Sequence, residues 1–169
     1  MVNVSSTNKS VQVPISGFST PPFGPINVRC GLVVYDGDRS SISDSLQFRG
    51  AAGTNFPVFA KITDAVHPVN NAFNSTIANY GAIVTSRNPQ DNNTLGYDAS
   101  LFNIPNASKE NLGNSATSAT LKFTTGSEAY RVGVVATMID IVDPEFDTKK
   151  SVVDVNGGSL QPGDILEYT

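Results

Sequence analysis

The acidic residues between positions 36 and 44 are the first in this sequence whose types and spacing could do chemistry. The segment is DGDRSSISD, which puts Asp36, Asp38, Ser40 and Asp44 at positions 1, 3, 5 and 9 of a single loop. Hard cations such as Ca²⁺ are held in proteins by about six to eight oxygen ligands, and alternating carboxylates in a turn can supply several of them. The pattern therefore predicts a Ca²⁺ site made by these four side chains.

The same loop has a second interpretation, as a solvated turn between two strands. It is not an EF-hand, because its sixth position is Ser41 rather than glycine and Gln47 stands where the bidentate glutamate would be. Aspartate side chains also stabilise turns, since they accept hydrogen bonds from backbone groups two residues further on. At the level of sequence both interpretations, cation site and plain turn, stay open.

Residues for catalysis do not form a recognisable set. His67 is the single histidine, so a Ser-His-Asp triad would depend on it, and the chain has no nucleophile-elbow motif. Asp140 ends an otherwise apolar run, where simple exposure to solvent is the favoured interpretation. The single cysteine, Cys30, falls on the apolar side of an alternating segment and is predicted to be a small buried hydrophobe. The protein is therefore predicted not to be an enzyme.

Composition indicates an exported β protein. Charged residues make up 15% of the chain and its net charge is −4, so Asn, Ser, Thr and Gly carry most of the polarity. No basic cluster or arginine-plus-aromatic platform is present, and nucleic acid is not expected as a partner. No apolar run reaches the roughly 18 residues that a membrane helix needs. The first residues, MVNVSSTNKS, also lack the pattern of a signal peptide.

Strand patterns predict the architecture that would position the acidic loop. The longest apolar run, residues 128–142, predicts a central strand that is apolar, and so covered, on both faces. Its residues Val132 and Val134 are expected on one buried face. The turn signal at residues 125–127 predicts an antiparallel hairpin with the alternating segment 118–125. The predicted fold class is all-β, an antiparallel β-sandwich of jelly-roll-like type with long loops.

One short connector helix is predicted between residues 70 and 80. Phe73, Ile77 and Tyr80 repeat at the i, i+4, i+7 spacing of a helix face, with glycine at position 81 to end it. Tyr80 is also one of three tyrosines in or beside predicted loops that could contact a ligand. The other two are Tyr35 and Tyr97.

The chain is predicted to contain one complete module and the start of another. Residues 1–147 are assigned to the β-sandwich module. Residues 148–169 are assigned to a linker and the truncated first strands of a following immunoglobulin-like repeat domain, since the final ILEYT stops within a strand pattern.

Five segments, taken together and in this order, resemble one family. They are VPISGFSTPPFGPINVR, YDGDRSSISD, HPVNNAFNSTI, TTGSEAYRVGVVATMIDI and TKKSVVDVNGGSLQPGDILEYT. They look like the N-terminal β-rich module of large surface proteins of spore-forming and other Gram-positive bacteria. In that family the module precedes tandem conserved-repeat domains of immunoglobulin-like, isopeptide-forming type. The resemblance covers nearly the whole chain.

The resemblance implies a non-catalytic structural or adhesive role outside the cell, on the cell or spore surface. Expected partners are neighbouring domains of the same chain, other surface or appendage proteins, or a host or matrix ligand. It also implies that Lys150 is the lysine that can form an isopeptide bond to an asparagine of the repeat domain. Because that domain is truncated at Thr169, no crosslink is expected within residues 1–169.

A carbohydrate-binding module with a structural Ca²⁺ is the alternative function. Such modules are also β-sandwiches, but the chain has no tryptophan and few aromatic residues for a flat sugar-stacking face. Tyr35, Tyr80 and Tyr97 would have to serve instead.

Overall fold

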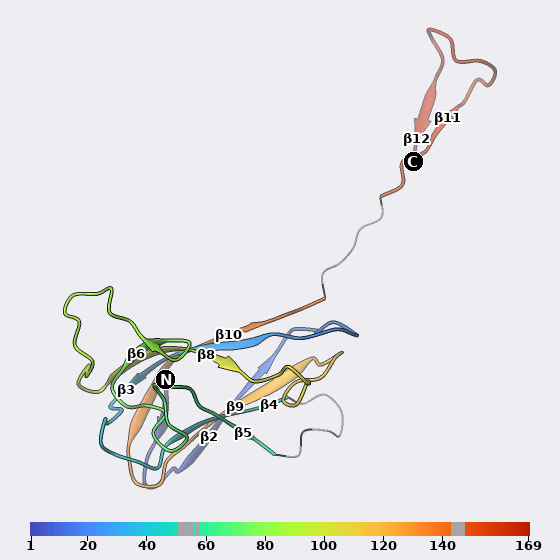
Figure 1. Cartoon of the computed structure of the whole chain (residues 1–169). Coiled ribbons are helices and arrows are strands. Elements are labelled where there is room, and N and C mark those ends of the chain that lie inside the picture. Colours follow the sequence, from blue (N-terminus) through green and yellow to red (C-terminus); the bar gives the residue numbers. More distant parts are fainter. Residues whose placement is uncertain (51–55, 57, 143–147) are drawn as a thin grey trace.

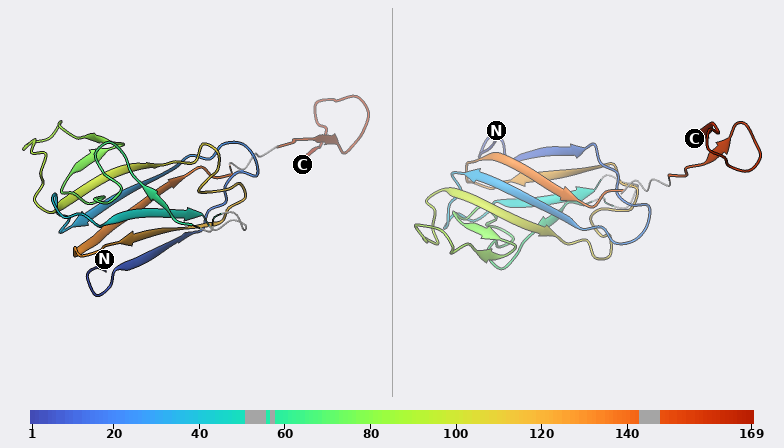
Figure 2. Two further views of the ribbon diagram at one scale, coloured as in Figure 1. Left: turned by 60° about the horizontal axis from the view of Figure 1, so that its bottom comes forward. Right: turned by 90° about the horizontal axis from the view of Figure 1, so that it is seen from above.

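The structure, a computed structural model, describes residues 1–50, 56, 58–142 and 148–169. Over these residues the secondary structure is entirely β, which confirms the predicted all-β class. Two sheets face each other, and a small hairpin follows later in the chain (Figure 1). Both views of Figure 2 show the strands of the two sheets running along the long axis of this two-layered body.

The larger sheet has six strands in the order β1-β10-β3-β8-β6-β7. Its pairs are antiparallel except that β6 runs parallel to β8. The strands are β1 (Val2–Val4), β10 (Tyr130–Ile139), β3 (Val28–Tyr35), β8 (Tyr97–Ile104), β6 (Ile77–Asn79) and β7 (Ala82–Ile83).

The smaller sheet has four antiparallel strands in the order β2-β9-β4-β5. Pro14 lies within β2, at the edge of this sheet, where its missing N–H does not interrupt an inner ladder. The strands are β2 (Ser10–Ser16), β9 (Ser118–Thr124), β4 (Ser45–Gly50) and β5 (Ala60–Ile62).

The chain crosses from one sheet to the other several times, and the crossing between β9 and β10 overturns the predicted hairpin of residues 118–142. β9 lies in the smaller sheet and β10 in the larger one, so the two strands are neighbours in sequence but not in a ladder. The connection between them is bound elsewhere, because the Gly126 amide donates to the Ser43 carbonyl oxygen at 3.0 Å. Both strands have an apolar inner face. This pattern predicts that the face is buried, but it does not show which strand is the hydrogen-bonded neighbour.

The core lies between the inner faces of the two sheets. From the larger sheet it takes residues such as Cys30, Phe102 and Val132, and from the smaller one residues such as Phe48 and Phe123. Cys30 is 0% exposed, and burial raises the pKa of its thiol to about 12. The prediction that it is a buried hydrophobe is confirmed.

β10 is not covered on both faces, contrary to the prediction from its apolar sequence. Tyr130 and Val132 point into the core, but the register with β3 shifts between Val132 and Val134. This β-bulge inserts Gly133 and reverses the phase, so that Val134 is 51% exposed. Beyond the bulge the inward positions are Val135 and Ile139, which pack against the core.

The predicted helix at residues 70–80 is wrong. The segment is an irregular loop that ends in β6, and its polar side chains bind the backbone of other segments. The Asn74 Nδ2 donates to the Val66 carbonyl oxygen at 2.8 Å, and the Ser75 hydroxyl donates to that of Gly37 at 2.6 Å. Asparagine and serine compete with helical hydrogen bonding in this way, and here they fix a loop although the apolar spacing suits a helix.

The C-terminal part forms a separate two-stranded antiparallel sheet of β11 (Val152–Asp154) and β12 (Leu166–Tyr168). The predicted module boundary near residue 147 lies outside the described residues. No helix in the part of the chain that the structure describes is long and apolar enough to cross a membrane.

Candidate functional site

Three acidic side chains from distant parts of the sequence meet at one end of the two-layered body. Asp44 directly precedes β4, Asp98 is the second residue of β8, and Glu128 comes two residues before β10. Their exposed fractions are 0%, 3% and 5%. We call these three residues the acidic cluster.

Each carboxylate of the acidic cluster is hydrogen-bonded through one oxygen. The Phe73 amide donates to Asp44 Oδ2 at 2.8 Å, and the Asp38 amide donates to Glu128 Oε1 at 2.5 Å. Asp98 Oδ1 accepts from the Thr76 amide at 2.9 Å. The second oxygen of each group, Asp44 Oδ1, Asp98 Oδ2 and Glu128 Oε2, is buried without a hydrogen-bond partner.

Burial raises the pKa of all three carboxyl groups, and charge repulsion adds to the shift of Asp98 and Glu128. Desolvation is the largest cause in each case, and it raises the pKa of Asp44 to about 6, of Asp98 to about 7 and of Glu128 to about 8. The charge of Asp44 adds to the shift of both other groups. Burial, together with Asp44 and Glu128, also raises the pKa of the neighbouring Tyr130 phenol. These carboxyl groups therefore keep their protons to higher pH than ordinary carboxyl groups do.

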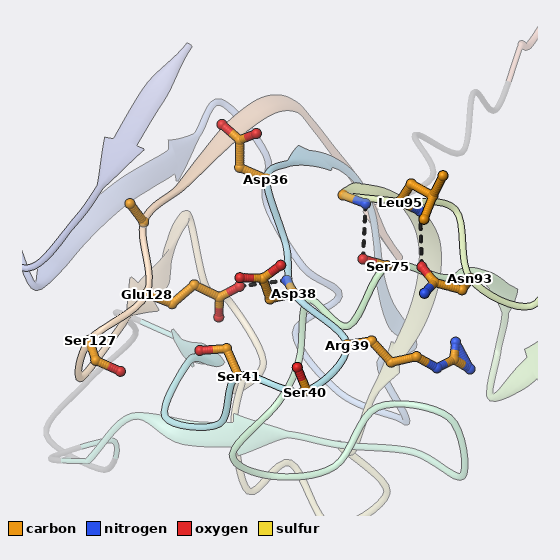
Figure 3. A pocket seen from close by; sticks show the side chains of 12 residues that line it. Asp36, Asp38, Arg39, Ser40, Ser41, Ser75, Asn93, Leu95, Ser127 and Glu128 are labelled. Atoms are coloured by element: carbon orange, nitrogen blue, oxygen red, sulfur yellow. Dashed lines mark hydrogen bonds between the residues drawn. The ribbon is translucent and has the colours of Figure 1, made fainter.

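An open cavity of about 740 Å³ leads from the surface to Glu128. Its lining includes Asp38, Ser40 and Ser127, while Arg39, which also lines it, donates to the Asn92 carbonyl oxygen at 2.8 Å. Figure 3 shows the Glu128 carboxylate beside Asp38 and the Arg39 guanidinium pointing away from both.

Gly37 brings the loop backbone close to the cluster. A Cβ at this position would lie 2.3 Å from Asp98 Oδ2 and 2.6 Å from the Phe73 carbonyl oxygen. Any side chain at position 37 would collide with both oxygens, so this position requires glycine.

The structure divides the four predicted metal ligands. Asp36 points away from the acidic cluster, with its side chain 63% exposed and 3.4 Å from Arg131 Nη1. Asp38 and Ser40 are exposed and line the cavity. Asp44 alone of the four is buried, and it is not among the residues that line the cavity.

Sequence reasoning missed Asp98 and Glu128. Both occupy core-facing positions: Asp98 is in phase with the buried Ser100 and Phe102, and Glu128 with the buried Tyr130. An acidic residue in the inward phase of a strand pattern was the available signal, because a buried carboxylate needs a partner.

The three predicted ligand-loop tyrosines do not form one site. Tyr35 and Tyr97 are directly paired between β3 and β8, with ring centroids 5.6 Å apart and planes at 60°. Tyr80 lies beside the other end of β3, where the Arg29 guanidinium stands 5.5 Å from its ring. The separation leaves an edge-to-face pair and a single ring rather than a flat stacking platform.

His67 is part of a chain of hydrogen bonds in the order of a catalytic triad. Asp64 Oδ1 is 2.8 Å from His67 Nδ1, and Ser100 Oγ is 3.1 Å from Nε2. The imidazole is 0% exposed and packs on Phe102 with centroids 4.6 Å apart; burial lowers its pKa. With histidine and serine both buried, this network ties the loop before β6 to β8.

Lys150, the predicted isopeptide lysine, is exposed, with its Nζ 4.4 Å from the centre of the Tyr168 ring in the C-terminal hairpin. Asp140 is also exposed, as expected, and its Oδ2 accepts hydrogen bonds from the amide and side chain of Asn27.

Comparison with known protein families, with curated proteins and with solved structures finds no match to this chain.

Proposed function

We propose that this chain is a non-catalytic structural and adhesive module of an extracellular bacterial surface or spore-appendage protein. We further infer that its fold is a jelly-roll-like β-sandwich. Two strand orders support that assignment, β1-β10-β3-β8 in one sheet and β2-β9-β4-β5 in the other. The chain crosses between these sheets several times.

The observation that carries the proposal is a contrast between the two outer faces of the body. The outer face of the larger sheet is apolar at its centre, where a hollow of about 330 Å³ is lined by residues including Val33, Leu101 and Val134. Val134 and Met138 there are 51% and 46% exposed. Exposed apolar patches of this kind mark sites of protein interaction.

The outer face of the smaller sheet is polar. Its four strands place Gln12, Lys122, Gln47 and Lys61 in one row of directly paired residues. The same protein therefore presents one face suited to water and one suited to contact with another protein.

A second copy of this module is the partner we assign to the apolar face. Flat sheet faces pack best on other flat sheet faces, at a spacing of about 10 Å. The apolar face of this chain offers a surface of that shape and chemistry, and a protein built of packed copies would bury it. The small charged fraction of the chain and the family resemblance support an external structural role.

Sedimentation velocity over a wide range of concentrations tests this function. We expect the protein to self-associate, and Val134→Lys to remain a folded monomer because a charge then stands in the centre of the contact. The matched control is Thr120→Lys, on the outer face of the smaller sheet, which should associate like the unchanged protein. A monomer at every concentration, or equal association of both variants, would contradict the proposal.

Carbohydrate binding is the second candidate, because Tyr35 and Tyr97 are exposed by 41% and 36% and touch each other. Their edge-to-face geometry lacks a flat platform, so we expect a glycan array to show no binding. Binding that Tyr97→Ala abolishes would favour this function instead.

A further inference from the structure

We propose that the outer face of the smaller sheet binds a linear phosphate polymer, one that carries neither bases nor sugar rings. The site is centred on Arg49 and Lys122, and Lys61 extends it toward the edge of the sheet. It lies on the face opposite to the one assigned to self-association, and it does not depend on that assignment.

The outer face of the smaller sheet is positively charged, although the chain as a whole is negatively charged. The four strands β2, β9, β4 and β5 contain Lys122, Arg49 and Lys61 but no aspartate or glutamate. The net charge of the chain is −4, so the acidic residues lie in other segments. A separation of charge of this kind draws an anionic partner to the basic face.

The strand register gathers the three cations on one face. Lys122 is directly paired with Gln47, and Gln47 with Lys61, so the two lysines stand two strands apart in one row. Neighbouring strands lie about 4.8 Å apart, so the backbones of the two lysines are separated by about 10 Å. Arg49 is two residues from Gln47 along β4 and therefore points to the same face. The sequence alone shows no basic cluster because each cation belongs to a different strand.

Phe59 holds two of these cations beside each other. The guanidinium carbon of Arg49 is 4.4 Å from the centre of the Phe59 ring, and Lys122 Nζ is 5.1 Å from it. Contacts between a cation and an aromatic ring orient the positive charges without neutralising them. Among the described residues, no salt bridge includes Arg49, Lys122 or Lys61. The face therefore presents two adjacent positive charges that no carboxylate of these residues neutralises.

Phosphate is the oxyanion that suits this pair. The planar guanidinium of an arginine donates parallel hydrogen bonds to two oxygens of one phosphate, and a lysine ammonium binds phosphate as a point charge. Thr120 is directly paired with Arg49 and adds a hydroxyl group to the same face. The row of Gln12, Gln47 and Lys61 continues beyond the pair, so a chain of phosphates makes more contacts than a single one.

The four strands of this sheet offer no free aromatic surface for bases or sugar rings. Single-stranded nucleic acids are held in large part by bases that stack on aromatic side chains. The aromatic residues within the four strands, Phe48 and Phe123, are buried in the core. Phe59, beside them, has Arg49 and Lys122 against its ring. The ligand is therefore one that charge and hydrogen bonds recognise without stacking.

Calorimetric titration with long-chain inorganic polyphosphate tests the site. We expect binding at low salt that weakens steeply as the salt concentration rises, because exposed charges are screened. Inorganic phosphate, a single-stranded oligonucleotide and vesicles that contain phosphatidylglycerol should each bind more weakly at the same concentration of phosphate groups.

Matched substitutions separate this face from the charge of the whole chain. Arg49→Gln and Lys122→Gln should each weaken polyphosphate binding by about threefold or more, and the double variant by about tenfold or more. Arg29→Gln and Lys150→Gln are the controls, since each removes the same charge and a similar contact with an aromatic ring from another part of the chain. Both controls should bind polyphosphate as the unchanged protein does. Thr120→Lys adds a charge at the centre of the face and should tighten binding.

Absence of polyphosphate binding at low salt would overturn the proposal, and so would an equal loss of binding in the face variants and the controls. Tighter binding of the oligonucleotide or of the vesicles would overturn it as well, and would assign the face to nucleic acid or to a lipid surface. Thermal melts establish that each variant is folded. If Arg49→Gln is not, Lys61→Gln at an exposed position takes its place with the same expected outcome.

Discussion

The carboxyl groups of the acidic cluster make the stability of the protein sensitive to pH. The pKa values of Asp98 and Glu128, about 7 and about 8, lie far above the ordinary values of 3.8 and 4.5 that these groups have in an unfolded chain. Between the two sets of values the folded protein binds more protons than the unfolded one. Stability is therefore greatest at low pH for these groups and is lost as pH rises through their folded pKa.

We expect the melting temperature to fall as the pH rises from about 6.5 to about 8. The lower limit avoids His67, whose pKa is lowered by burial from 6.5 and which opposes the trend only in more acidic solution. Melts of Glu128→Gln in the same buffers should show a shallower decline. A melting temperature that is constant or rises over this range would show that the three carboxyl groups are not buried together.

At the residue scale, the sequence pointed to only one of the three residues of the acidic cluster, Asp44. Asp44 stands in an acidic loop, where composition alone draws attention. Asp98 and Glu128 are isolated acids in strand contexts, and their chemistry arises from which strands become neighbours. The same holds for Ser100 and Asp64, which only the fold brings to His67.

At the scale of the element, the bulge in β10 decides which apolar residues are core. Val132 is 2% exposed and Val134 is 51% exposed, although both belong to one alternating row in the sequence. One extra residue reverses the pattern that follows it. A uniform apolar run cannot reveal where that residue lies.

Val134→Asp should therefore fold, with a loss of stability below about 1 kcal/mol, as at other exposed positions. Val132→Asp places a charge in the core and should not yield soluble folded protein. Circular dichroism and thermal melts of the two variants provide the comparison. Failure of Val134→Asp to fold would show that this face is covered within the monomer.

Most strands were nevertheless predictable, because alternating apolar and polar residues indicate a strand that is buried on one face. The segments that became β2, β3 and β9 show it clearly. Their pairing was not predictable from the same signal, since β9 and β10 supply opposite layers rather than one hairpin. The helix prediction for the loop before β6 was wrong for another reason. Asparagine and serine side chains there make hydrogen bonds to the backbone of other segments, in place of the backbone hydrogen bonds of a helix.

At the scale of the whole molecule, the C-terminal hairpin bears on the crosslink that the family resemblance implies. Isopeptide formation needs a lysine neutralised by an apolar environment, with a carboxylate and an asparagine in reach. Lys150 is instead exposed against the ring of Tyr168.

Intact-mass spectrometry should therefore give the mass of the unmodified sequence, with no loss of ammonia from residues 1–169. Ammonia loss from residues 1–169 would place both partners within them.

The pairing of strands that are remote in sequence bears on how this protein folds. β1 pairs with β10, the last strand of the body, and β2 pairs with β9. Contacts between such remote segments make folding slow, in the range of about milliseconds to seconds for β-sandwiches. During synthesis the first two strands have no partners until nearly the whole body has left the ribosome. We therefore expect these strands to pair late in folding. Until then Pro14 and the polar side chains of β2 disfavour pairing with a wrong edge.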